Sequence, residues 1–159
     1  MKPVINLNDL ELQAVPPEGH FEQSYAVISE QIGAKKLGYN LTVVPPGKRG
    51  CPFHNHHVNE EMFLILEGEG TLRFGDQEYP LRAHDIIACP PGKRDVAHQM
   101  INTGSEPLRY LALSTVERAE ICEYPDSNKV GVYVGEWGNM DLRALFKADQ
   151  TVDYNDGEV

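Results

Sequence analysis

The segment that decides the fold is Gly50-Cys51-Pro52-Phe53-His54-Asn55-His56-His57-Val58-Asn59-Glu60-Glu61, in which three histidines precede a pair of glutamates. In an extended strand, residues two apart share a face, so His54 and His56 are expected to project together. A short break at residues 58–59 lets the chain reverse, and Glu61 then opens the next apolar run. Two imidazole nitrogens and a carboxylate oxygen near one point suit a divalent transition metal: Mn, Fe, Co, Ni, Cu or Zn.

A fourth ligand is predicted at His98, which opens a second β-rich run after a repeated turn signal. The sequence VPPGKR at residues 44–49 returns almost unchanged as CPPGKR at residues 89–94. Each copy leaves an apolar run and leads to a histidine, as two similar halves of a β-sandwich would. A single histidine would be read as an ordinary core or surface residue. The combination of HxH, a carboxylate and a later histidine instead predicts a metal site.

The rest of the chain between residues 25 and 115 consists of short apolar runs separated by turn-forming residues. Strands this short and this evenly spaced are typical of an all-β sandwich or closed barrel. The predicted strands are Tyr25–Ile28, Gly38–Val44, Glu61–Leu66, Thr71–Phe74, Glu78–Leu81, Asp85–Cys89, His98–Asn102 and Leu108–Thr115.

A length of 159 residues fits one domain with three parts. Residues 1–37 are expected to form an N-terminal arm, with one or two short strands packed on the barrel. Residues 38–116 form the barrel core. Residues 117–159 form a C-terminal extension of the same domain, which ends in a solvated acidic tail. Within that extension, residues 138–148 are expected to form a short helical turn.

These motifs resemble the cupin superfamily. In its first motif, HxH is followed by three or four residues, a glutamate, six residues and a glycine, as are His54 and His56, then Glu61 and Gly68. The resemblance implies a double-stranded β-helix, also called a jelly-roll or cupin barrel. It also implies that the metal lies inside this barrel.

The second cupin motif is matched at its core by Pro90-Pro91-Gly92, His98 and Asn102. The chain departs from the motif at two points. His84 stands where the motif has its first glycine, and five residues instead of two separate the turn from His98. The departures predict an altered turn at His84 and a longer loop before the last ligand.

Small cupins of this type are similar to bacterial proteins described as proposed sugar-phosphate isomerases. The resemblance therefore implies a metal-dependent protein acting on a small oxygen-bearing molecule, such as a sugar or sugar phosphate. A non-haem metal dioxygenase and a non-catalytic module that binds a small ligand are the alternatives. His57, His84 and Tyr110 are the candidates for a catalytic base, although an outward-facing position for the histidines and core packing for the tyrosine are the simpler interpretations.

Four basic residues follow the two Pro-Pro-Gly turns. If these turns lie at the barrel mouth, the basic side chains can hold a phosphate or carboxylate; otherwise they are ordinary solvated turn residues. The residues are Lys48, Arg49, Lys93 and Arg94. Cys51, three residues before His54, is either redox-active or an inert packed thiol.

The overall composition excludes several partners. The formal net charge of -10, from 14 basic and 24 acidic residues, argues against nucleic acid and anionic membranes, although a small anionic substrate stays compatible with a locally basic pocket. Without a secretory signal or a spanning segment, a cytoplasmic protein is expected. The segment Glu61–Leu66 is apolar on both faces. Its outer face must be covered either by another sheet of the same chain or by a second subunit, and a homodimer through this face is expected.

Overall fold

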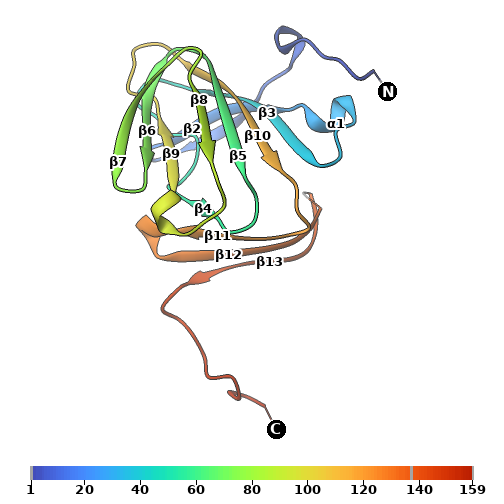
Figure 1. Cartoon of the computed structure of the whole chain (residues 1–159), viewed down its shortest axis with the longest axis vertical. Helices are drawn as coiled ribbons and strands as arrows, with labels where there is room; N and C mark the ends of the chain where they lie inside the picture. Colours follow the sequence, from blue (N-terminus) through green and yellow to red (C-terminus); the bar gives the residue numbers. More distant parts are fainter. Residues whose placement is uncertain (1, 137, 159) are drawn as a thin grey trace.

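The computed structural model describes residues 2–136 and 138–158 and confirms the all-β prediction (Figure 1). Its strands form three antiparallel sheets. The largest contains, in spatial order, β1 (Gln13–Glu18), β2 (Phe21–Val27), β3 (Leu37–Val44), β10 (Leu108–Thr115), β5 (Glu61–Glu67) and β8 (Ile86–Cys89). A second sheet contains β7 (Gln77–Arg82), β6 (Glu69–Phe74) and β9 (His98–Ile101). The third contains β13 (Asn139–Lys147), β12 (Lys129–Glu136), β11 (Ala119–Tyr124) and β4 (Asn55–His56).

The hydrophobic core lies between the six-stranded and three-stranded sheets. On β5 the side chains alternate, so that Phe63 and Ile65 are buried while Met62 and Leu64 are half-buried on the opposite face. This alternation follows from the two-residue period of a strand. The core residues are Val44, Phe63, Ile65, Leu72, Leu81, Ile87, Cys89, Met100, Leu108, Tyr110 and Ala112. This core borders the predicted metal ligands, because the ring of Phe63 lies 5.8 Å from that of His98 between centroids.

Helical structure within the described residues is limited to short segments. They are the helix α1 (Ser29–Ile32) and the 3-10 turns η1 (Leu7–Asp9), η2 (Arg94–Val96) and η3 (Pro125–Ser127). The turn η2 occupies the lengthened loop before His98. No helix among the described residues is long and apolar enough to cross a membrane. The cytoplasmic location stays a prediction.

The N-terminal arm contains two strands, β1 and β2, and the C-terminal extension contains more β-structure than the sequence indicated. At the N-terminus, β1 continues through Pro16-Pro17, which is possible because β1 is an edge strand and its ladder shifts register between Val15 and Glu18. At the C-terminus, β11–β13 run across one end of the barrel beside β4, and the tail leads away from the body (Figure 1). The helical turn predicted for residues 138–148 is wrong, because this segment pairs with β12 as strand β13.

The turn between β7 and β8 explains why a histidine can replace a glycine of the motif. His84 has φ 76°, in the left-handed region that glycine adopts readily. Its backbone N–H donates to the Ile65 carbonyl, and the Asp85 side chain accepts from the Arg82 N–H. These hydrogen bonds hold His84 in the left-handed conformation, at the cost of some backbone strain.

Candidate metal centre

The four predicted ligands come from three strands whose ends meet. His54 and His98 exchange two backbone hydrogen bonds, with N···O distances of 2.8 and 3.2 Å, and form an antiparallel bridge. Directly opposed residues in such a bridge share a face, so the two imidazoles lie together. His56 lies two residues beyond His54 on the same face, and Glu61 begins β5. The expected projection of His54 and His56 from one face of the chain is therefore confirmed.

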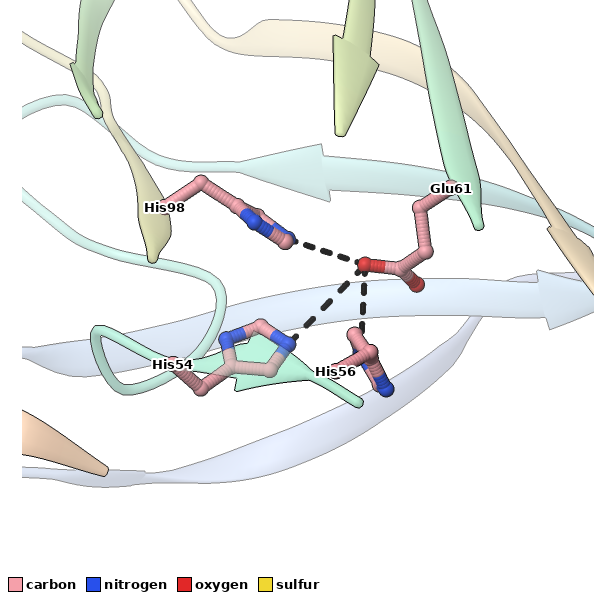
Figure 2. Close-up of side chains that lie close together, drawn as sticks. All are labelled: His54, His56, Glu61 and His98. Carbon is pink, nitrogen blue, oxygen red and sulfur yellow. Dashed lines mark hydrogen bonds and ion pairs between the residues drawn. The ribbon is translucent and has the colours of Figure 1, made fainter. Parts of the chain in front are cut away.

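The side chains converge on one oxygen of Glu61 (Figure 2). The Nε2 atoms of His98, His56 and His54 lie 2.9, 3.3 and 3.9 Å from Glu61 Oε2. One donor atom from each of the four residues lies within 4.8 Å of the other three. The side chains are only 4–17% exposed, so water competes weakly for them. This arrangement has the donor number and the compactness of a mononuclear metal site.

Two of the histidines are oriented by nearby backbone carbonyls. His54 Nδ1 lies 2.9 Å from the Pro52 carbonyl oxygen, and His98 Nδ1 lies 3.3 Å from that of Val96. A carbonyl can only accept, so Nδ1 carries the hydrogen in both rings. When either ring is neutral, its lone pair therefore resides on Nε2, the atom that points into the cluster. In the metal-free protein His98 Nε2 donates a hydrogen bond to Glu61 Oε2, and a metal would take the place of that hydrogen.

His56 is oriented differently, by side chains of the third sheet. Its Nδ1 lies 3.3 Å from Cys122 Sγ and 3.4 Å from Glu120 Oε2. Its Nε2 is buried and has no hydrogen-bond partner, because the nearby Glu61 oxygen is within reach but poorly aligned. A buried polar atom without a partner is costly. A metal ion coordinated by Nε2 would remove that cost, so the residues present fit a metal.

Electrostatics in the metal-free cluster favour added positive charge. Burial alone would raise the pKa of Glu61, but the close imidazoles of His56 and His98 hold that pKa well below its usual range. Burial opposes the charged form of His56, yet its contacts with Cys122, Glu120 and Glu61 raise its pKa to about 12. A group of acceptors that binds a proton this tightly is suited to a divalent cation, which would take the place of that proton.

His54 behaves in the opposite way. Burial, followed by the charge of His98, lowers the pKa of His54 to about 4. Its ring is therefore neutral at physiological pH and can donate its Nε2 lone pair without first losing a proton. Three imidazoles and one carboxylate are borderline donors, which suit Mn, Fe, Co, Ni, Cu and Zn and do not select among them.

The three candidate bases do not join this cluster. His57 is exposed just after β4, and its ring is directed away from the cluster, with Nε2 2.8 Å from Glu123 Oε1. His84 is exposed in the turn between β7 and β8. Tyr110 is 4% exposed in the barrel core, where its ring packs edge-on against Phe63. The geometry thus supports the simpler interpretation for each of them.

The two Pro-Pro-Gly turns lie at different ends of β9. The Gly47 N–H donates to the Asn102 carbonyl, whereas the Gly92 N–H donates to the His56 carbonyl beside the metal centre. Lys48, after the first turn, pairs with Glu22. The two copies therefore do not place their basic residues around one opening, as a shared phosphate site would require.

Arg94, after the second turn, pairs with Glu123, the same carboxylate that contacts His57. Lys93 beside it is exposed and Arg49 is half-buried. These positions are those of ordinary turn residues. Cys51 also has the simpler role, since burial raises the pKa of its thiol to about 12 and leaves it protonated.

Sequence reasoning missed three residues that contact the ligands, all on β11. Glu120 and Cys122 lie beside His56, and the ring of Tyr124 stacks on His54 with centroids 6.1 Å apart. The Tyr124 hydroxyl lies 2.9 Å from that of Tyr133, and burial together with this hydrogen bond raises its pKa. The sequence of this strand, AEICEY, gave no apolar–polar alternation that would mark its buried face, because the buried residues include Glu120.

Two surface hollows lie elsewhere on the barrel, at the edge strand β7. One is lined by Leu72, Phe74, Tyr79, Pro80, Leu81, Asp85, Ile86, Ile87 and Ala88. The other is lined by Glu69, Gly70, Thr71, Pro80, Leu81, Arg82, Asp85, Thr103 and Gly104. Neither hollow includes a residue of the metal cluster.

Comparison with known proteins agrees with this geometry. The sequence profile of the cupin domain matches residues 40–114, which hold all four clustered residues. The chain contains a cupin domain. An uncharacterised protein of Methanocaldococcus jannaschii is 32% identical over 72 residues, covering 45% of this chain and 54% of its own length. The glucose-6-phosphate isomerase of Pyrococcus horikoshii is 30% identical over 101 residues, covering 56% of this chain and 51% of its own length.

Solved structures match over a larger part of the chain. A protein of Acidithiobacillus ferrooxidans, described as a proposed sugar phosphate isomerase, has a TM-score of 0.81 at 23% identity, covering 95% of this chain and 96% of its own. A cupin sugar phosphate isomerase of Silicibacter pomeroyi has a TM-score of 0.79 at 22% identity, covering 97% and 98%. At these identities the likeness establishes the fold. The predicted double-stranded β-helix of the cupin superfamily is confirmed.

Proposed function

We propose that this cupin binds one divalent transition metal, Mn, Fe, Co, Ni, Cu or Zn, through His54, His56, Glu61 and His98. The supporting observation is the convergence of four donor atoms, one of which, His56 Nε2, is buried without a hydrogen-bond partner. Four protein ligands leave about two positions open on a six-coordinate metal. A substrate with two neighbouring oxygens can occupy both positions.

We further propose that the protein is an isomerase of a sugar or sugar phosphate. Support comes from the curated relative named glucose-6-phosphate isomerase and from two neighbours in fold described as sugar phosphate isomerases. The chain spans about half the length of the first of these. When bound, the metal would supply Lewis-acid chemistry to the hydroxyl and carbonyl oxygens of the sugar.

The chain's own residues support this role in two ways. The ionised Glu61 and the fixed Nε2 atoms are already in position before the metal and substrate bind. The ligand side chains therefore need little rearrangement. Tyr124, whose raised pKa keeps its hydroxyl protonated, stacks on the ring of the proposed ligand His54. It can donate a hydrogen bond to a substrate oxygen, and it is not suited to act as a base at neutral pH.

The test combines elemental analysis with turnover assays. Purified protein is expected to contain near-stoichiometric metal, which the double variant His54→Ala, His98→Ala loses. The metal-loaded protein is then assayed with a panel of aldose and ketose phosphates. Turnover supports the isomerase, whereas failure on the whole panel contradicts it. Oxygen uptake by the iron-loaded form, with thiols, enediols and phenols, would favour a dioxygenase instead.

A non-catalytic binding module is the second candidate function. The observation favouring it is the oxalate-binding protein of Thermotoga maritima, which is 27% identical over 96 residues, covering 60% of this chain and 76% of that protein. Oxalate presents two neighbouring oxygens, as the open positions require. Thermal stabilisation by such a dicarboxylate without turnover of any sugar would favour this candidate.

We also propose that the protein is a homodimer, formed through the outer face of the six-stranded sheet. Ile86 is 71% exposed on this face, directly opposite the half-buried Leu64. Size-exclusion chromatography with light scattering is expected to give a dimer, which Ile86→Asp converts to monomer. Val152→Asp, at an exposed position in the tail, serves as the control. A monomeric wild-type protein would contradict the proposal.

A further inference from the structure

We propose that Glu120 is a positioning residue of the metal centre. It orients the His56 imidazole and fixes the loop of residues 57–59, which joins the ligands His56 and Glu61. The inference rests on the metal site proposed above. It extends the centre to β11, which pairs with β4 in the third sheet and carries none of the four ligands.

The carboxylate of Glu120 is 8% exposed and is held by an unusually complete set of donors. It accepts four hydrogen bonds from backbone N–H groups. Oε1 accepts from His57, Val58 and Ile121 at 3.1, 3.2 and 2.8 Å, and Oε2 accepts from Asn59 at 2.7 Å. A buried carboxylate in this environment is compensated and has a fixed orientation.

The pairing of β11 with β4 brings this carboxylate to the imidazole. Cys122 is directly opposite His56 in the ladder, and Glu120, two residues earlier, projects from the same face of β11. Glu120 Oε2 consequently lies 3.4 Å from His56 Nδ1. A carboxylate at the outer nitrogen favours the tautomer whose Nε2 lone pair faces the metal and makes that nitrogen a stronger donor.

The same carboxylate sets the spacing between two ligands. Three of its four hydrogen bonds come from consecutive residues of the loop 57–59, which separates His56 from the strand that begins at Glu61. The end of the loop is fixed a second time, because Asn59 Oδ1 accepts from the Thr115 hydroxyl and the Glu117 N–H, both at 3.0 Å. The loop conformation, and with it the separation of the ligands, is therefore imposed by residues far along the chain.

Glutamine cannot replace glutamate in this position. A carboxylate only accepts, whereas one end of a carboxamide only donates. In Glu120→Gln the amide nitrogen would face either backbone N–H groups or His56 Nδ1. Loss of such an outer-shell partner typically lowers metal affinity about 10–100-fold.

The experiment compares Glu120→Gln with Glu123→Gln in the full chain. Glu123 is a matched control, since it lies on the same strand and contacts a histidine, His57, that is not a ligand. Affinity for Co²⁺ is measured by chelator competition, and the absorption spectrum of bound Co²⁺ reports the ligand geometry. Circular dichroism of the metal-free proteins separates loss of fold from loss of positioning.

We expect Glu120→Gln to bind Co²⁺ about 10–100-fold more weakly, with a shifted absorption spectrum, and Glu123→Gln to match the wild type. Should Glu120→Gln not fold, Glu120→Asp keeps the charge one methylene further away, and a smaller loss with the same spectral shift is expected. Unchanged affinity and spectrum in these variants would overturn the role of Glu120 and leave the proposed metal site standing. A wild type that binds no metal would instead overturn the proposed function. Two ions per chain, one lost in Cys122→Ser, would also overturn the inference, since Glu120 would then be a ligand of a second site.

Discussion

His54 and His56 belong to the same three-residue motif, yet different parts of the protein hold them. The Nδ1 atom of His54 is fixed by the Pro52 carbonyl, two residues away along the chain. The Nδ1 atom of His56 faces Cys122 and Glu120, which are more than sixty residues away in sequence. One half of the motif is therefore oriented locally, and the other half depends on the packing of the C-terminal strands against the barrel.

The opposite pKa shifts of the two histidines follow from this difference. His54 has a neutral carbonyl on one side and other imidazoles on the other, so burial is the largest influence and its pKa falls to about 4. His56 lies between two carboxylates, and its pKa rises to about 12. Two histidines of one motif thus become two different ligands. His54 is ready to bind a metal, whereas His56 must first lose a proton.

The largest expected effect is the loss of either ligand. His54→Ala and His56→Ala should each weaken metal binding at least about 100-fold, because four ligands share a binding free energy of roughly 10–16 kcal/mol. Chelator competition measures the change. His57→Ala is the control and should bind like the wild type, since the His57 ring contacts Glu123 on the outside. Equal losses in all three variants would contradict the assignment of the faces.

Titration of the metal-free protein tests the predicted contrast between the pKa values of His54 and His56. Histidine NMR is expected to show His54 neutral above about pH 4 and His56 still protonated at pH 9. Because the pKa of His56 is raised above 6.5, its stabilisation is complete below pH 6.5 and is lost as the pH rises toward 12. Because the pKa of His54 is lowered, stability falls as the pH drops from 6.5 toward 4.

A proton count gives an independent check on this titration. Calorimetry in buffers of different ionisation enthalpy should show about one proton released from His56 per metal bound at pH 7. Metal binding without proton release, together with a neutral His56 in the NMR titration, would contradict the contrast between the two rings.

The smallest expected effect is that of Cys122→Ala. Its thiol and the carboxylate of Glu120 both lie beside His56 Nδ1. The carboxylate stays in place in this variant, so metal affinity should fall less than about tenfold. Thermal unfolding should show a modest loss of stability from the small cavity. A loss of affinity as large as that of Glu120→Gln would mean that the thiol, and not the carboxylate, orients the ring.

The sequence predicted the barrel and the four clustered residues but not the strands that complete the centre. The strands between residues 25 and 115 were found because their apolar alternation and turn residues agree with the fold. Strand β11 was missed because Glu120 points inward, where a polar residue is not expected. Strand β13 was read as helical because the segment contains Leu, Ala, Arg and Met, and pairing with β12 overrides that weak preference.

The sequence alone determined which side chains could meet on one face of a strand, because the two-residue period is a local property of the backbone. That was enough to place His54 and His56 together and to expect Glu61 and His98 beside them. Only the tertiary structure decided what lies behind those ligands, including Glu120 at His56 and Tyr124 over His54. Contacts between residues far apart in the chain depend on how the sheets pack, and no local pattern in the sequence encodes that packing.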